Sequence, residues 1–197
     1  MSKHNIRKTY KYALANLSED ELNDAKYWYD IAQNEARDVA IEFDMPVYIV
    51  AGVIAAISPN LEWGRNKQNA YDLIKAYLGG DDMDSVKVSA YPDNKRKAWR
   101  ILQEMPDYDE MKIILNGQKI VPFYSNIMGE DVITIDGHAR NIYYNERVGL
   151  TTSRNHVGKK EYRHIASEYA KVAKELGLLG RELQAITWVA WKKKHNI

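Results

Sequence analysis

One short segment of the chain places an acid and a histidine at the start of a predicted helix: Asp136-Gly137-His138. It follows the apolar run 132–135, and the segment 139–150 after it has helical character. Aspartate is a favoured N-cap residue, and a single acid at a helix start commonly does nothing more. A helix N-terminus also stabilises negative charge, so the same carboxylate could stay ionised and serve as a catalytic group. The segment alone leaves both interpretations open.

The elements that must position this segment are predicted to be helices. A capping box at residues 18–21 opens a helix that runs to about residue 43. The run 47–57 is apolar on every face, which is typical of a buried helix, and Gly52 within it would let a neighbouring helix approach closely. Helical periods and capping signals predict the other helices over 64–78, 94–103, 107–116 and 122–129, a helix after 136, and two C-terminal helices separated at 177–180.

These patterns predict an all-α protein. The 197 residues fit one domain, so we expect residues 1–197 to form a single helical domain. The apolar run 132–135 is at most a short stretch of extended chain.

Four segments of the chain occur in an order that points to a known family. A buried helix ends in Ser-Pro-Asn at residues 58–60, and a helix with a Lys-Ala pair at 97–98 follows. A helix, a tight turn at 117–119 and a second helix come next, and the acid segment is last. This order and spacing resemble the helix-hairpin-helix DNA glycosylase superfamily, the endonuclease III-like enzymes, over about residues 47–150. The resemblance implies a helix-hairpin-helix DNA glycosylase-like fold, with N-terminal and C-terminal helices packing on that core.

The resemblance assigns roles to individual residues. Asp136 matches the family's catalytic aspartate, and His138 matches the histidine two positions later. Lys119, 17 residues before Asp136, matches the hairpin lysine that acts as nucleophile in bifunctional glycosylase/lyases. Gly117 lies in the hairpin whose backbone holds a DNA phosphate in the family. Asn60 falls where many members have a glutamine that fills the gap left by a flipped base.

The chemistry agrees with these roles. Breaking an N-glycosidic bond builds positive charge on the sugar, and a preorganised carboxylate such as Asp136 would lower that barrier. Lys119 must be neutral to attack, so its pKa must lie below the ordinary value of about 10.4. The base must be flipped out or presented single-stranded. We therefore expect a DNA glycosylase-like enzyme that acts on a flipped-out base, with lyase activity if Lys119 is the nucleophile.

The chain departs from the family pattern in the hairpin and around the acid. The hairpin, residues 115–119, lacks a second glycine and is two residues shorter, and Asp-Gly-His replaces Asp-Thr-His. A divergent phage branch of the superfamily, thought to modify bases rather than excise them, would fit these departures, and Asp136 would still lie at a flipped nucleotide. A non-catalytic DNA-binding module is the third alternative, and it should tolerate loss of Asp136.

Charge is distributed unevenly along the chain. The formal net charge is +1, but residues 18–44 carry −7, so the remainder carries +8. An acidic element on an otherwise basic body is compatible with a polyanion bound on one side, and the resemblance makes DNA the expected partner. The candidate DNA contacts in the basic stretches are Lys95, Lys97, Arg154, Lys159 and Lys160.

Other classes of protein are disfavoured by the composition. The chain has no cysteine, which excludes disulfides and thiolate-held zinc or iron–sulfur clusters, and its five histidines lack the short spacings of a metal site. We expect neither a metal nor a cofactor. The longest apolar run, 47–57, falls short of the roughly 20 residues of a membrane span, and the N-terminus lacks the apolar region of a signal peptide. The expectation is a monomer in the cytoplasm, or in the host cytoplasm if a phage encodes it.

Overall fold

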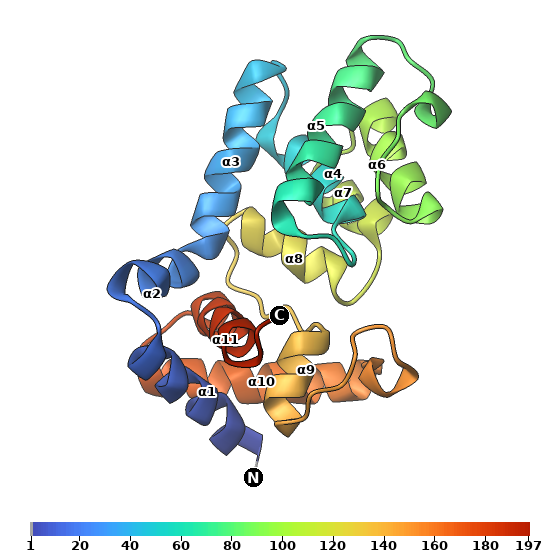
Figure 1. Cartoon of the computed structure of the whole chain (residues 1–197). Coiled ribbons are helices and arrows are strands. Elements are labelled where there is room, and N and C mark those ends of the chain that lie inside the picture. Colours follow the sequence, from blue (N-terminus) through green and yellow to red (C-terminus); the bar gives the residue numbers. More distant parts are fainter. Residues whose placement is uncertain (1) are drawn as a thin grey trace. The chain divides into compact units, whose positions relative to one another are not determined.

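A computed structural model describes residues 2–197 (Figure 1). Every regular element in this range is a helix and none is a strand, which confirms the all-α prediction. The helices are α1 (Ser2–Asn16), α2 (Glu19–Lys26), α3 (Trp28–Glu42), α4 (Val47–Ile57), α5 (Trp63–Leu78), α6 (Pro92–Glu104), α7 (Tyr108–Leu115), α8 (Ile120–Ile127), α9 (Gly137–Tyr144), α10 (Lys159–Leu176) and α11 (Gly180–His195), with short 3-10 helices η1 (Met83–Ser85) and η2 (Ser153–Asn155).

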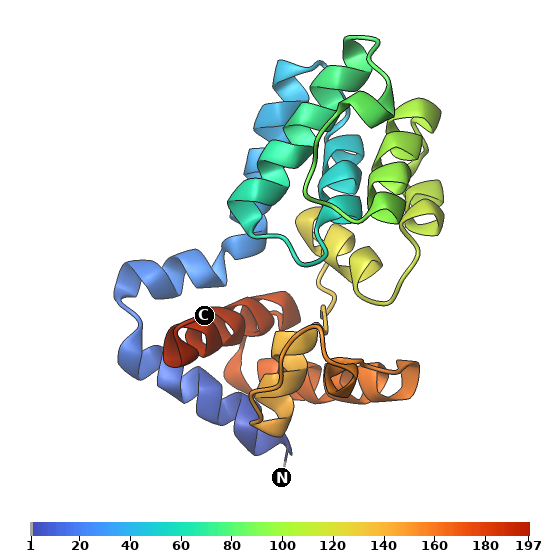
Figure 2. The ribbon, with the colours of Figure 1, turned by 45° about the vertical axis from the view of Figure 1, so that its right-hand side comes forward.

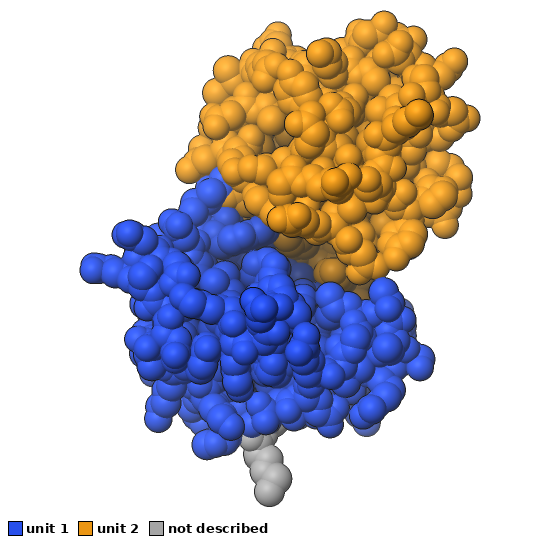
Figure 3. All heavy atoms as spheres, in the orientation of Figure 1, with its two compact units in different colours: residues 1–31, 129–197 blue, residues 32–128 orange. Residues whose placement is uncertain are grey.

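The helices group into two compact units (Figure 3). Unit 1 comprises residues 2–31 and 129–197, and unit 2 comprises residues 32–128. Helix α3 begins in unit 1 and continues in unit 2. The predicted glycosylase-like core, 47–150, has parts in both units, and its organisation as one domain stays a prediction.

Unit 2 is built around α4. Nine consecutive residues of this helix, 49–57, are buried, and α4 contacts α5, α6, α7 and α8. Pro46 precedes the helix as its N-cap, where the absent N–H of proline costs nothing. A Cβ added at Gly52 would overlap the side chain of Met111 on α7, so the predicted close approach of a neighbouring helix at this glycine is confirmed.

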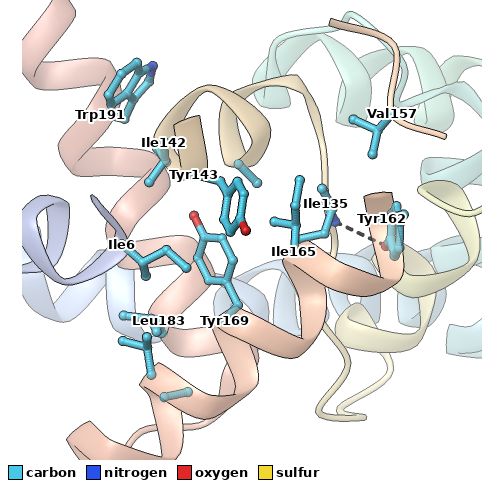
Figure 4. Packing of buried hydrophobic residues seen from close by; sticks show 13 residues of the cluster. Ile6, Ile135, Ile142, Tyr143, Val157, Tyr162, Ile165, Tyr169, Leu183 and Trp191 are labelled. Carbon is cyan, nitrogen blue, oxygen red and sulfur yellow. Dashed lines mark hydrogen bonds between the residues drawn. The ribbon is translucent and has the colours of Figure 1, made fainter. Parts of the chain in front are cut away.

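Unit 1 buries a core between α1, α9, α10 and α11 (Figures 2 and 4). Ile6 comes from α1, Ile142 and Tyr143 from α9, and Ile165 and Tyr169 from α10. Their side chains point toward one another in Figure 4. In α11, five residues that share one face of the helix are all buried: Leu183, Ile186, Thr187, Ala190 and Trp191.

The helix expected over 18–43 is interrupted, so that prediction was wrong in its length. The capping box is present: Ser18 and Glu21 exchange side-chain to backbone hydrogen bonds of 3.1 and 2.7 Å. Tyr27 then leaves the helical conformation, at φ −95° and ψ 18°, between α2 and α3. Immediately beyond this break, buried Tyr29 donates to Gln184 of α11 at 2.9 Å, a tertiary contact that no helical period reveals.

Because α4 is buried, we expect truncation of one of its side chains to destabilise unit 2. Replacing Ile54, 2% exposed, with alanine should lower the free energy of unfolding by about 2–5 kcal/mol, because the cavity cannot close fully. Urea unfolding measures the loss. Ile41→Ala is the matched control: Ile41 is 73% exposed and its truncation should stay within about 0.5 kcal/mol. Equal effects at the two sites would contradict the buried placement of α4.

Candidate active site

Asp136 is the N-cap of α9, as its sequence context predicted. Its backbone is extended, at φ −106° and ψ −174°, and its Oδ1 accepts a hydrogen bond from the N–H of Ala139 at 2.8 Å. Its Oδ2 accepts none from the described residues, and the side chain is partly exposed. The carboxylate therefore has one oxygen fixed by the helix and a second available to a ligand.

Another aspartate N-cap, Asp107 at the start of α7, makes more hydrogen bonds than Asp136. Its Oδ1 accepts from the N–H groups of Asp109 and Glu110 at 3.0 and 2.8 Å. Its own N–H donates to the Glu110 carboxylate at 3.1 Å, which completes a capping box. Asp136 has a single bond and no reciprocal partner, so capping uses less of its hydrogen-bonding capacity.

Tyr162 of α10 holds the extended segment that leads to Asp136. Its hydroxyl donates to the carbonyl of Ile133 at 3.0 Å and accepts from the N–H of Ile135 at 3.1 Å (Figure 4). This segment belongs to no helix or strand, so its buried backbone groups need partners from elsewhere. One phenol supplies two of them.

The start of α11 holds the same segment from a second direction. The N–H of Arg181 donates to Asp131 at 3.0 Å, and its guanidinium pairs with Asp30 at 3.1 Å. A Cβ at Gly180 would lie 2.8 Å from Ile133, so only glycine lets the helix start approach this closely. Together, α10 and α11 hold the extended segment 131–135 that precedes Asp136.

The negative charge of Asp136 contributes to the environment of two buried phenols. Burial, with a smaller contribution from Asp136, raises the pKa of Tyr162 to about 12. Burial also raises the pKa of Tyr169, again with a contribution from Asp136. Both phenols stay protonated at neutral pH, so they can donate hydrogen bonds but add no charge beside the acid.

The loop after α9 folds back over the start of that helix. The side-chain amides of Asn141 and Asn155 both donate to the carbonyl of Val148, at 2.8 and 3.3 Å. A Cβ at Gly137 would lie 2.7 Å from the Asn155 amide and 2.8 Å from Leu150. The glycine of Asp-Gly-His therefore gives the returning loop its space, a constraint that a sequence match cannot show.

His138 has an aromatic environment. Its ring packs edge-on against Trp188 of α11, with centroids 6.1 Å apart at 84°. Trp188 in turn meets Trp28 at 6.2 Å, and all three rings are partly exposed. Trp28 and Trp188 lie outside the segment that resembles the glycosylases, so the resemblance gave no reason to select them.

The predicted hairpin lies in unit 2, between α7 and α8. Its turn has two residues with positive φ, Asn116 at 40° and Gly117 at 128°, and the latter value favours glycine. Lys119 is partly exposed and occupies the N-cap position of α8. Lys97 donates to the carbonyl of Leu115 at 2.8 Å, so this predicted DNA contact also ties α6 to the turn.

The two other predicted contacts of unit 2 lie on its surface. Asn60 is exposed in the left-handed conformation, at φ 62°, and its amide donates to the Tyr91 hydroxyl at 2.7 Å. Lys95 is on α6, and its side chain makes no hydrogen bond or ion pair with the described residues. Asn60, Lys97, Gly117 and Lys119 thus belong to the unit that lacks Asp136.

Three predicted basic contacts lie in unit 1. Arg154 is in η2, with its side chain 75% exposed and 3.9 Å from Glu146. Lys159 and Lys160 open α10 and border a hollow of about 530 Å³ that Tyr144, Gly158, Glu161 and His164 also line. Asp136, His138, Arg154, Lys159 and Lys160 therefore share a unit, whereas the expectation that Asp136 and Lys119 act at one site stays a prediction.

Comparison with known proteins adds a family without an assigned activity. The model of a family of unknown function, DUF7178, matches residues 2–195. The chain belongs to this family. No curated protein and no solved structure matches the chain.

The described residues give two further observations. No three His, Cys, Asp or Glu side chains among them are grouped so as to hold a metal ion. No single helix in residues 2–197 is long and apolar enough to cross a membrane; α3 and α4 pass that test only as a pair bent by 118°, and α4 is buried inside unit 2. The predictions of no metal and no membrane stay predictions.

Tyr162→Phe tests the clamp, by which we mean the two hydrogen bonds of the Tyr162 hydroxyl to the segment that precedes Asp136. At neutral pH the variant should lose about 1–3 kcal/mol of unfolding free energy, because the Ile135 N–H loses its acceptor. Ionisation of Tyr162 should also cost the wild type about 2–3 kcal/mol of unfolding free energy between pH 10 and 12, since the unfolded phenol ionises near its ordinary pKa and the folded one only near 12. The phenylalanine variant lacks this contribution but keeps the alkaline loss from Tyr169, whose pKa burial also raises.

Chemical unfolding followed at several pH values measures both effects. Tyr27→Phe is the control, because Tyr27 is 43% exposed and its hydroxyl has no partner among the described residues. A Tyr162→Phe variant that matches Tyr27→Phe at every pH would show that the clamp contributes nothing.

Proposed function

We propose that this chain is a helix-hairpin-helix DNA glycosylase-like enzyme that acts on the N-glycosidic bond of a flipped-out nucleotide. The observation that carries the proposal is the state of Asp136. Its carboxylate is fixed at a helix N-terminus through one oxygen, while the other accepts no hydrogen bond from the described residues. The extended segment before Asp136 is held in place by hydrogen bonds from α10 and α11.

This arrangement supplies what cleavage of a glycosidic bond requires. Positive charge develops on the sugar in the transition state, and a carboxylate already fixed in place stabilises it without reorganisation. Asp136 would lie against the sugar, with its free Oδ2 facing the developing charge or positioning the attacking water. The N–H groups at the N-terminus of α9 interact favourably with negative charge at this position.

The hairpin of unit 2 supports DNA as the substrate. Gly117 is exposed at positive φ, and α8 begins directly after Lys119, so backbone N–H groups and a lysine lie together at a helix start. Such a start attracts a phosphate. In this proposal Lys119 is a phosphate contact or the nucleophile.

Replacing Asp136 with asparagine tests the role of the acid. Asparagine is nearly isosteric and also caps helices, so the fold should survive while the charge is lost. We expect the reaction rate on DNA to fall by about 10² to 10³. The measurement is nucleoside mass spectrometry after incubation with DNA that carries different modified bases, because it separates a released base from a chemically altered one.

Asp107→Asn is the matched control, since it also removes a carboxylate from a helix N-cap but lies at the start of α7. The Asp107→Asn variant should act on DNA at the same rate as the wild type. An Asp136→Asn variant with full activity and unchanged melting would reduce Asp136 to a helix cap. An altered rather than released base would assign the chain to base modification instead of excision.

Borohydride trapping tests Lys119 separately. If Lys119 attacks the sugar, it forms a Schiff base that borohydride reduces to a stable protein–DNA adduct. Lys119→Gln should then abolish the adduct, whereas Lys75→Gln, which removes an exposed lysine on α5 of unit 2, should keep it. Excision without any adduct in the wild type would leave Lys119 as a phosphate contact only.

A further inference from the structure

Aromatic rings from three helices of unit 1 meet near the start of α9. Trp188 of α11 contacts Trp28 of α3 with centroids 6.2 Å apart at 60°, and His138 of α9 at 6.1 Å and 84°. The Nζ of Lys192 lies over the Trp188 ring, 4.6 Å from its centroid. These contacts join a cation to three rings, one of which, His138, is two residues after Asp136 in the chain.

Burial separates this cluster from the hydrophobic core. Trp191, one turn further along α11, is 1% exposed and belongs to the core of unit 1. Trp28, His138 and Trp188 are all partly exposed and lie outside that core. Each of these three residues therefore keeps some surface exposed to solvent.

The chemistry of the cluster suits a nucleobase. Bases stack on exposed aromatic rings with little regard to sequence, because every base presents a π-face. The Lys192 ammonium over Trp188 is a weaker contact than a stacked base. A base could replace the ammonium on that face, and the flexible lysine could then reach the phosphate of the same nucleotide.

We infer that Trp28, His138 and Trp188 form a stacking platform for an unpaired nucleobase of the bound DNA strand, with Lys192 contacting its phosphate. This inference rests on the proposed function, because the position of His138 two residues after Asp136 places the base close to the reacting nucleotide. The platform draws on residues outside 47–150, so it is a property of the appended helices.

The test compares two short single-stranded oligonucleotides of equal length and charge, one with bases and one built of abasic sites. Fluorescence anisotropy of the labelled strands gives the affinities. Trp188→Leu should weaken binding of the strand with bases by roughly 5- to 150-fold and leave the abasic strand unchanged. Trp188→Phe keeps a stacking ring and should retain most of the affinity.

Trp63→Leu is the matched control. Trp63 also has a lysine over its ring, Lys67 at 5.7 Å, and an edge-on neighbour, Phe123 at 6.4 Å, but it lies on α5 of unit 2. Its replacement should not change the preference for bases. If Trp188→Leu lowers the melting temperature too far for binding to be measured, Trp28→Leu is read in the same way.

Each outcome separates the platform from the proposed function. Equal weakening on both strands, no weakening, or a wild type that does not prefer bases would overturn the platform. Full excision activity together with any of these results would leave the proposed function standing. A base-dependent loss in Trp188→Leu, with no reaction on any DNA, would keep the platform and sink the proposed function.

Discussion

The hydroxyl of Tyr162 is the contact on which the geometry around Asp136 depends. The segment before Asp136 runs through the interior of unit 1 without a strand partner, and two of its backbone groups are satisfied by that one oxygen. Because a phenol both donates and accepts, no apolar side chain of similar size can replace it. The position of the acid is thus tied to α10 rather than to α9 alone.

Asp136 shows that a helix cap and a reactive group need not be alternatives. The cap interpretation is confirmed by the bond to Ala139, yet this bond occupies one oxygen only. The Asp107 carboxylate accepts hydrogen bonds from two N–H groups, and the Asp107 N–H donates to the Glu110 carboxylate. The two aspartates therefore share the role of N-cap but differ in the number of hydrogen bonds that the cap makes.

Local patterns predicted the helices of this chain well, and tertiary contacts account for the misses. The apolar density of 47–57 and the capping signals at Ser18 and Asp107 depend on neighbours in sequence, so the sequence sufficed to place them. The break at Tyr27 and the clamp by Tyr162 depend on partners far along the chain. Of the candidate site, the N-cap was predictable, whereas the aromatic surroundings of His138 were not.

The catalytic and DNA-binding roles of the candidate residues were inferred from the family resemblance. The division of the chain into two units limits how far that inference reaches. Residues 47–150 cross from unit 2 into unit 1, so sequence order alone cannot set the distance between the hairpin and the acid. Lys97 illustrates a further limit: its charge suggested a phosphate contact, but its ammonium also holds the end of α7.

The connectivity of the units has a consequence for biosynthesis. Unit 2 is continuous in sequence, whereas unit 1 is assembled from both ends of the chain. During translation unit 2 is complete once residue 128 has emerged, while α1 and α2 still lack the helices that cover them. Domains generally fold as units, with earlier segments first. Here the order is reversed for the N-terminal helices: they are made first, but α2 and the side of α1 that contacts α11 stay uncovered until α11 leaves the ribosome.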